Sequence, residues 1–377
     1  MTILTLANAY GPRTGGIRTQ IDQLRRCYAA AGHHPVLVAP AAADGDEADA
    51  SGPIHWRRAP RLPINPDYRN LWALRPLLRL AEQIGPDSVE IVDKWTLPRL
   101  AKPLRAAGLP VIGFSCERLD QVLRPYLGAG ALTRAAIGRY NAWFARQFDR
   151  VVCHSAFAAA ELPGPAEVVP LGVDVTQFGP ERRDEALRRE LLGDGRVLLL
   201  YVGRLVREKQ VGLLAAMMSE LAGRGARLVV AGSGPEAARL AAAPGVRLLG
   251  FTRQTERLAA LYASCDLFVH PSPIESFGLG VLEALASGCR VVGASGGAVA
   301  EVLPPAFPRA RPQAAAWVAA VEQALAIDPV AAARAARAAA GRYPWERCAD
   351  RLLAIHGNKG VRSEWRFHSP SPDQLTP

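Results

Sequence analysis

Short apolar segments alternate with amphipathic helix patterns along this chain, and the whole alternation occurs twice. The first helix pattern places Ile17, Ile21, Leu24 and Tyr28 on one face, which is the spacing of an α-helix. In this half, strands are predicted at residues 2–7, 36–39, 89–92, 111–114 and 151–153, with a long helix at 131–148. Apolar strands that alternate with helices form a parallel sheet covered on both faces.

The alternation restarts after a junction at residues 170–174 and a polar stretch at 178–194. Further strands are predicted at residues 197–202, 227–231, 246–249, 266–270 and 290–293. The length of 377 residues suits two domains. The predicted fold class is therefore α/β, with two doubly wound parallel-sheet domains at 1–174 and 175–344. They would face each other across a cleft, where ligands bind in such folds.

Three segments lie outside these two alternating patterns. Residues 41–52 are small and acidic, which predicts a surface loop. Residues 345–357 have the spacing of one more amphipathic helix, and the proline-containing segment 358–377 is predicted to be a disordered tail. No apolar run approaches the ~20 residues of a membrane-spanning helix, and the N-terminus is typical of a first strand rather than a signal peptide.

The charge of the chain favours anionic ligands. Lysine and arginine total 45 against 35 acidic residues, a net charge of +10. Phosphates or a lipid surface suit this excess, whereas nucleic acid is disfavoured because no basic stripe carries interleaved aromatic residues. Arg57, Arg58 and Arg61 would either meet anionic lipid or lie in an ordinary solvated loop. The six cysteines show neither paired nor zinc-like spacing, which predicts free thiols and a cytoplasmic location.

A glycine-rich loop follows the first predicted strand. Gly15 and Gly16 stand directly before the first helix, so their backbone can approach a ligand closely and the helix N-terminus favours an anion. A phosphate or sugar contact is the favoured interpretation, and a plain glycine turn is the alternative.

Two basic residues occupy the corresponding turn of the second half. Arg204 and Lys209 lie five positions apart between a strand and a helix, so both could converge on one diphosphate. The alternative is the solvated start of a basic helix. No D-x-D motif is placed to hold a cation against a diphosphate, so the sequence predicts neither a metal nor another cofactor.

Two glutamates flank the start of a later helix. Glu275 precedes it and Glu283 lies within it. The backbone amides of Ser276, Phe277, Gly278 and Leu279 would form an anion seat with the helix dipole. The carboxylates beside that seat could accept hydrogen bonds from sugar or ribose hydroxyls. The alternative is one capping acid and one surface acid, although the apolar neighbours of Glu283 suggest that it has a specific partner.

Together these stretches resemble the retaining glycosyltransferases of family 4, which have the GT-B architecture of two Rossmann-like domains. The matching segments occur in the family's order over most of the chain. They are residues 11–16, 170–174, 203–209, 231–235, 250–251 and the Glu-x7-Glu pair at 275 and 283. Residues 7–19 and 117–120 are most similar to actinobacterial GDP-mannose-dependent mannosyltransferases that act on phosphatidylinositol mannosides and related glycolipids.

The resemblance implies a role for each matching residue. Gly16 would lend its amide to the donor phosphates, which Arg204 and Lys209 would neutralise without a metal. Glu275 would hold hydroxyls of the donor sugar, and Glu283 would bind the nucleotide ribose. Phe251 would lie beside the base. The helix at 345–357 would cross back to pack on the N-terminal domain, which would bind the acceptor.

The sequence departs from the family pattern at Cys116, because similar members have histidine immediately before the residue that matches Glu117. A thiol is a weak hydrogen-bonding partner, so either another group replaces the histidine, or the sugar or acceptor differs, or activity is reduced. His154 is interpreted as structural, and His270 is given no catalytic role.

The function expected from this resemblance is the transfer of a hexose, mannose from GDP-mannose, to a lipid-linked or glycolipid acceptor. The reaction would take place in the cytoplasm or at the inner face of the cell membrane. Several alternatives stay open. The chain could be a small-molecule, natural-product or polysaccharide glycosyltransferase using a UDP-sugar, a nucleotide-sugar epimerase, or a non-catalytic protein that binds nucleotide sugars.

Overall fold

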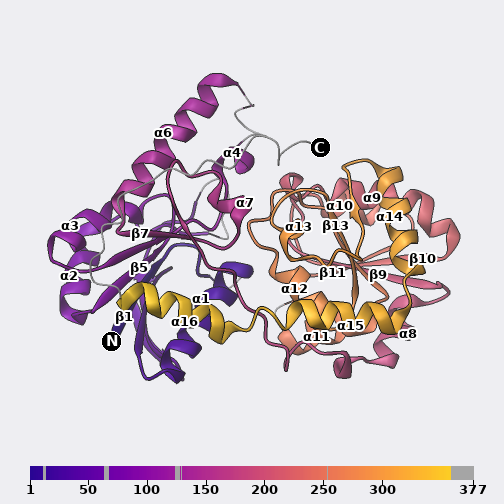
Figure 1. The fold of residues 1–377 in the computed structure, drawn as a ribbon, viewed down its shortest axis with the longest axis horizontal. Coiled ribbons are helices and arrows are strands. Elements are labelled where there is room, and N and C mark those ends of the chain that lie inside the picture. The colour runs from indigo at the N-terminus through magenta and orange to yellow at the C-terminus, as the bar shows by residue number, and fades with distance from the viewer. Residues whose placement is uncertain (12–13, 63–67, 124–127, 129, 253, 358–377) are drawn as a thin grey trace.

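The computed structural model describes residues 1–11, 14–62, 68–123, 128, 130–252 and 254–357. The predicted disordered tail at 358–377 lies outside the described residues. Within the described ranges the chain forms two α/β domains side by side, each built on its own sheet (Figure 1). The predicted fold class is thereby confirmed.

The described strands of the N-terminal domain form one sheet in the order β3-β4-β2-β1-β5-β6-β7-β8. All neighbours pair in parallel except β3, which runs antiparallel to β4. The strands are β1 (Thr2–Ala7), β2 (His34–Ala41), β3 (Gly45–Asp49), β4 (Gly52–Arg58), β5 (Ser88–Val92), β6 (Val111–Phe114), β7 (Arg150–Cys153) and β8 (Glu167–Val168). The helices are α1 (Gly16–Ala30), α2 (Leu74–Ile84), α3 (Ala101–Ala106), α4 (Leu119–Val122), α6 (Ala131–Gln147) and α7 (Ala156–Ala159).

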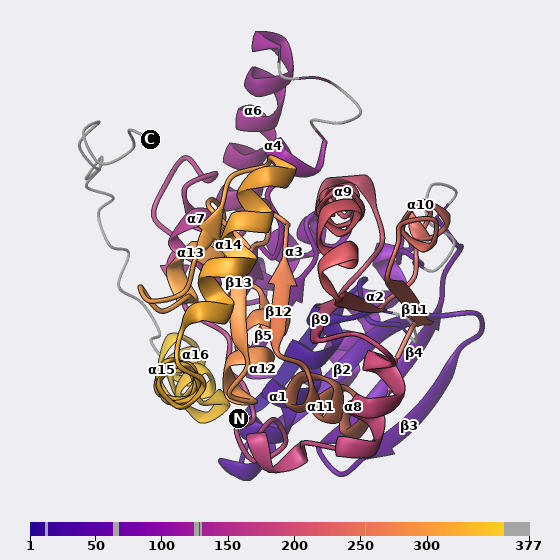
Figure 2. The ribbon, with the colours of Figure 1, turned by 90° about the vertical axis from the view of Figure 1, so that its right-hand side faces the viewer.

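In the C-terminal domain the described strands form an all-parallel sheet in the order β11-β10-β9-β12-β13-β14. Helices α9 and α14 cover one face, and α11, α12 and α15 cover the other (Figure 2). The strands are β9 (Val197–Val202), β10 (Ala226–Ala231), β11 (Val246–Gly250), β12 (Leu267–His270), β13 (Arg290–Ala294) and β14 (Arg309–Ala310). The helices are α8 (Glu185–Leu192), α9 (Gly212–Leu221), α10 (Ala237–Ala241), α11 (Thr255–Ser264), α12 (Leu279–Ala286), α13 (Val299–Val302), α14 (Ala314–Ala326) and α15 (Pro329–Ala340).

The segment expected to be a surface loop at 41–52 is instead half of a β-hairpin, formed by β3 and β4. Every residue of β3 is exposed and none is a large apolar residue, so no alternation marks the strand in the sequence. Side chains hold it instead: Asp46 accepts hydrogen bonds from Arg57 and His55, both at 2.8 Å. Arg57 therefore belongs to an edge hairpin and not to a solvated loop.

The last described helix, α16 (Trp345–Gly357), crosses from the C-terminal domain and packs on α1 (Figure 1). At its end, His356 Nδ1 lies 2.7 Å from Ser88 Oγ, and His356 Nε2 lies 3.0 Å from Glu90 Oε1. The crossing is tight at Gly172, where an added Cβ would lie 2.5 Å from backbone atoms of Trp345. Helix α16 thus connects the two domains near the start of β5, at the opposite edge of the N-terminal sheet from the loops that follow its parallel strands.

None of the described helices is by itself long and apolar enough to cross a membrane. One pair of helical segments, α14 and Pro329–Gly357, has the length and apolar composition of a span only when the two are taken together, and it is bent by 103° at the break between them.

Candidate active site

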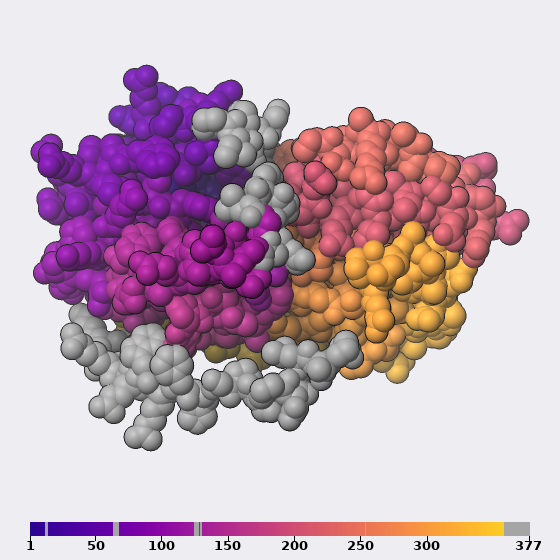
Figure 3. Space-filling model, turned by 90° about the horizontal axis from the view of Figure 1, so that it is seen from above, coloured from indigo at the N-terminus to yellow at the C-terminus, as the bar shows by residue number. Residues whose placement is uncertain are grey.

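The two domains touch at the loops that follow their strands. Ser155, after β7, donates a hydrogen bond of 2.7 Å from Oγ to the carbonyl oxygen of Ser276, before α12. The glycine-rich loop approaches the same helix, since a Cβ added to Gly16 would lie 3.5 Å from Leu279 Cδ1. Figure 3 shows the seam between the domains from above. The structure thus brings the predicted phosphate loop and the predicted anion seat together.

Lys209 and Glu275 form an ion pair within the predicted donor site. Lys209 Nζ lies 2.6 Å from Glu275 Oε2, and His270 Nε2 lies 3.3 Å from the same oxygen. Burial acts to raise the pKa of Glu275, but the Lys209 ammonium and the His270 ring outweigh it and hold this pKa well below its usual range. Glu275 is therefore a fixed carboxylate at neutral pH. His270, at the end of β12, is a partner that the sequence reasoning missed.

Arg204 remains available to a ligand. Its side chain is half exposed, and the described carboxylate closest to it, that of Glu208, is 3.8 Å away. The loop that carries it is fixed by Tyr201, whose hydroxyl donates to the carbonyl oxygen of Arg204 at 3.1 Å. Arg204 is thus half exposed and only loosely paired with Glu208, so a ligand can reach its guanidinium.

The predicted anion seat lies at the start of α12. Gly278 caps this helix with φ of 93°, a left-handed conformation that favours glycine. Phe277 is buried and its ring packs against Tyr343, so only its backbone can face a ligand. Phe251, directly after β11, is 43% exposed.

Glu283 has the specific partner that its apolar surroundings suggested. The Tyr262 hydroxyl donates to Glu283 Oε2 at 2.9 Å. Burial raises the pKa of Glu283 to about 7, although the hydrogen bond from Tyr262 opposes the shift. One carboxylate oxygen is thereby occupied and the other can accept from a ligand.

On the N-terminal side, Cys116 stands in a small polar cluster. Its Sγ lies 3.8 Å from His154 Nε2 and 3.9 Å from Gln20 Oε1. Burial raises the pKa of the Cys116 thiol well above its usual value and lowers that of His154 to about 4, so both are neutral. His154 Nδ1 is bonded to the carbonyl oxygen of Val169 at 3.0 Å. The cluster therefore carries no charge toward the cleft.

Glu117 is held by residues that the sequence reasoning did not single out. Trp95 Nε1 donates to Glu117 Oε1 at 3.0 Å, and Lys94 Nζ donates to the Glu117 carbonyl oxygen at 2.8 Å. Lys94 also pairs with Glu161 at 2.8 Å, and Glu161 accepts from the amide of Asp120 at 2.8 Å. The signal available in the sequence was the placement of Lys94, one of four lysines, two residues after the end of β5.

Burial raises the pKa of Glu117 and the nearby Asp93 adds to the rise, whereas Lys94, the hydrogen bond from Trp95 and Arg204 oppose it. Among the described residues, no group of three or more histidine, cysteine or acidic side chains is placed to hold a metal ion.

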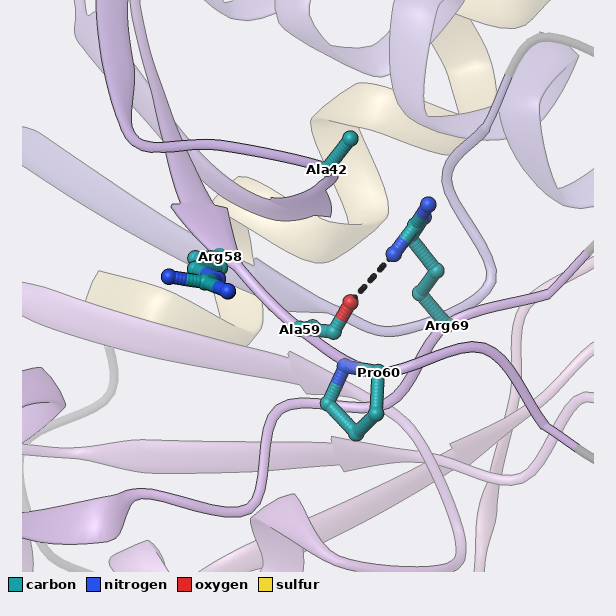
Figure 4. Close-up of a pocket in the computed structure, with 5 residues that line it drawn as sticks. All are labelled: Ala42, Arg58, Ala59, Pro60 and Arg69. Atoms are coloured by element: carbon teal, nitrogen blue, oxygen red, sulfur yellow. Dashed lines mark hydrogen bonds between the residues drawn. The ribbon is translucent and has the colours of Figure 1, made fainter.

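Two open cavities are lined by other residues than these. One, of about 430 Å³, is lined by Arg58, Ala59, Pro60, Arg69 and Ala42 on the N-terminal domain (Figure 4). In it, Arg69 donates a hydrogen bond to the carbonyl oxygen of Ala59. The other, of about 450 Å³, is next to α9 and includes Arg207 and Arg239.

Comparison with known proteins covers nearly the whole chain. Residues 14–177 match the family described as Glycosyltransferase Family 4, and residues 196–326 match that described as Glycosyl transferases group 1. The chain is 35% identical to the GDP-mannose-dependent alpha-(1-6)-phosphatidylinositol dimannoside mannosyltransferase of Mycobacterium tuberculosis, over 96% of this chain and 97% of that protein.

The solved structures it resembles share its fold. Sucrose-phosphate synthase from Thermosynechococcus elongatus superimposes with a TM-score of 0.77 at 20% identity, covering 95% of this chain and 98% of that one. WaaG, a glycosyltransferase involved in lipopolysaccharide biosynthesis, superimposes with a TM-score of 0.68 at 18% identity, covering 95% and 100%. These similarities establish the GT-B arrangement of the two domains.

Proposed function

The chain belongs to glycosyltransferase family 4, and from that premise we propose that it transfers mannose from GDP-mannose to a glycolipid acceptor with retention of configuration. The similarity to a mannosyltransferase over almost the full length of both chains carries this proposal. A glycolipid acceptor would place the reaction at the cytoplasmic face of the cell membrane.

The geometry supports a division of labour in the donor site. Arg204 and Lys209 bring positive charge to the position of the diphosphate, together with the first amides of α12. Their charge would stabilise the leaving diphosphate as its negative charge increases, so we propose that no metal ion is required. Full activity in the presence of EDTA is the expected result.

Glu275 is suited to a different task. As a carboxylate fixed by Lys209 and His270, it can accept hydrogen bonds from hydroxyls of the transferred sugar. Glu283, with one oxygen taken by Tyr262, can accept from the ribose. Cys116 leaves the acceptor side without the histidine of similar enzymes. His154, the neutral histidine beside the thiol, lies close to that position.

A panel of nucleotide sugars tests the donor. Purified protein is heated with GDP-mannose, UDP-glucose or ADP-glucose, and the shift in melting temperature is measured for each. A ligand present at 100 times its dissociation constant adds ~2.7 kcal/mol of stability. Stabilisation by GDP-mannose, with transfer of mannose to a mannoside acceptor as an α-linked product by NMR, is the expected outcome. Stabilisation by UDP-glucose alone would overturn the choice of donor.

A further inference from the structure

Trp95 is an exposed aromatic residue with a fixed orientation. Its side chain is 42% exposed, although large aromatic side chains normally bury most of their surface. The indole Nε1 is bonded to Glu117 Oε1 at 3.0 Å. On another side, the ring centroid of Tyr140 lies 6.5 Å from that of Trp95. The hydrogen bond at its edge fixes the orientation of the ring, and its exposed surface remains accessible to a ligand.

The loop that carries Trp95 is held in place by buried residues that are hydrogen-bonded to each other. Asn8, at the end of β1, donates from Nδ2 to Thr96 Oγ1 at 2.7 Å and accepts from the Leu71 amide at 2.9 Å. It thus joins two loops, each of which displays an exposed tryptophan: Trp95 and Trp72, the latter 57% exposed. Both loops lie at the carboxyl edge of the parallel sheet, where ligands bind in this fold class.

We propose that the open face of Trp95 is the platform on which a pyranose ring of the acceptor stacks, with the Glu117 carboxylate beside it as an acceptor for a sugar hydroxyl. A pyranose has an apolar C–H face and polar edges, so it matches an aromatic surface flanked by a carboxylate. The proposal rests on the function proposed above and narrows its acceptor to one that already carries a sugar.

The position of the platform agrees with transfer. Trp95 follows β5 and Glu117 follows β6, and at the same edge of the sheet Ser155 bonds to Ser276, which precedes α12. A sugar stacked on Trp95 would therefore lie on the side of the N-terminal domain that meets the proposed donor site. A tryptophan that inserts into lipid would keep its N–H for headgroups or water, whereas this N–H is bound to a carboxylate.

Leu132 provides a matched control. It is 88% exposed at the start of α6, which projects from the N-terminal domain in Figures 1 and 2. If exposed apolar side chains act only by touching lipid or an alkyl chain, Leu132→Ala should affect acceptor use as much as a change at Trp95. If Trp95 stacks on sugar, Leu132→Ala should have no effect on an acceptor without a chain.

The test compares Trp95→Leu, Trp95→Phe and Leu132→Ala with methyl α-D-mannopyranoside and octyl α-D-mannopyranoside as acceptors. Loss of the stacked ring in Trp95→Leu should raise KM for both acceptors roughly fivefold to tenfold. Trp95→Phe should recover most of this loss because a ring remains. GDP binding by calorimetry should stay unchanged. Unchanged KM values, or an increase confined to the octyl mannoside, would overturn the proposal.

A second measurement separates this proposal from the choice of donor. Saturation-transfer NMR detects binding of methyl α-D-mannopyranoside to the protein with GDP present and needs no turnover. We expect a signal for the wild type and Leu132→Ala, and its loss in Trp95→Leu. If the NMR signals follow this pattern while GDP-mannose fails as a donor, the role of Trp95 is supported and the choice of GDP-mannose is wrong. A wild type that gives no signal, or a Trp95→Leu signal equal to it, refutes the platform.

Discussion

The donor side and the acceptor side of the cleft each contain a lysine–glutamate pair, and the two pairs differ in burial. Lys209 and Glu275 keep 16% and 21% of their side chains exposed, at the end of loops in the C-terminal domain. Lys94 and Glu161 keep only 2% and 3%, behind the Glu117 loop. A ligand can reach and rearrange the first pair, whereas the second is part of the framework.

The difference in burial predicts a difference in role. A partly exposed pair exchanges one partner for a ligand at small cost, because water screens both charges. A buried pair that loses one member leaves an uncompensated charge, which is strongly destabilising. Changes to the Lys209–Glu275 pair should therefore affect binding and turnover, whereas changes to the Lys94–Glu161 pair should affect folding.

The largest effect is expected from Lys94→Met. This substitution leaves the buried Glu161 carboxylate without its cation and removes the hydrogen bond to the Glu117 carbonyl oxygen. We expect a loss of roughly 3–5 kcal/mol in the free energy of unfolding, measured by urea denaturation. The control is Arg224→Ala, which breaks the exposed pair with Glu322 and should cost at most ~1 kcal/mol. Equal losses from the two variants would remove the distinction between the pairs.

Glu275→Ala should give the next largest effect, on transfer alone. The carboxylate is proposed to contact the transferred sugar, so its removal should lower kcat by roughly 10²–10³-fold. Binding of GDP, measured by calorimetry, should be unchanged or slightly tighter, because Lys209 loses its competing partner and keeps its charge.

Glu275→Gln serves as the isosteric control. Its amide keeps the side-chain volume but cannot form the ion pair with Lys209. A loss of GDP affinity in both variants, with turnover preserved, would contradict the assignment of Glu275 to the sugar.

Lys209→Ala should weaken GDP binding by roughly 10-fold to 150-fold, the cost of one charged hydrogen bond of ~1.5–3 kcal/mol. Because Lys209 and Glu275 are in contact, the double variant should not show the sum of the two single effects. Calorimetric titration of the two single variants and the double variant provides this cycle. If the changes in GDP-binding free energy simply add, Lys209 and Glu275 are not in contact when GDP binds.

The residues proposed for the donor side were easier to find in the sequence than those that surround Glu117, for a physical reason. Arg204, Lys209, Glu275 and the start of α12 lie on short loops after strands, where the local order of residues fixes their direction. The contact of His270 with Glu275 depends on how the loop folds back, and no spacing pattern encodes that.

The acceptor side is assembled from separated segments. Glu161 lies 67 positions from Lys94, and Gln20 lies 96 positions from Cys116. Such partners become neighbours only when the sheet is complete. The β3 strand escaped prediction for a related reason, since charged side-chain pairs rather than an apolar face hold it. Strands such as β1, β5, β9 and β12 were predicted because burial on both faces makes them continuous apolar runs. The strands β4, β8 and β14 were not predicted, because β8 and β14 have two residues each and Ile54 is the one buried residue of β4.

The smallest effect tests whether the donor side depends on the charge of Glu283. Burial raises the pKa of this carboxyl to about 7, so a fall in pH through that value neutralises it. The ionised form accepts hydrogen bonds from the ribose more strongly than the neutral acid, so GDP should bind more weakly at low pH. Between pH 8 and pH 6, a group of this pKa changes its ionised fraction about tenfold, so the dissociation constant should rise by at most about that factor.

The β-phosphate of GDP also titrates in this range, so the measurement is the ratio of dissociation constants for the wild type and Glu283→Gln at each pH. The phosphate contributes equally to both proteins and cancels, which leaves the titration of Glu283. Tyr262→Phe should move the midpoint of this ratio to higher pH, because its hydroxyl stabilises the ionised carboxylate. A ratio that is flat from pH 6 to pH 8 would show that the charge of Glu283 does not contribute to GDP binding. The electrostatic part of GDP binding would then come from Arg204, Lys209 and the first backbone amides of α12.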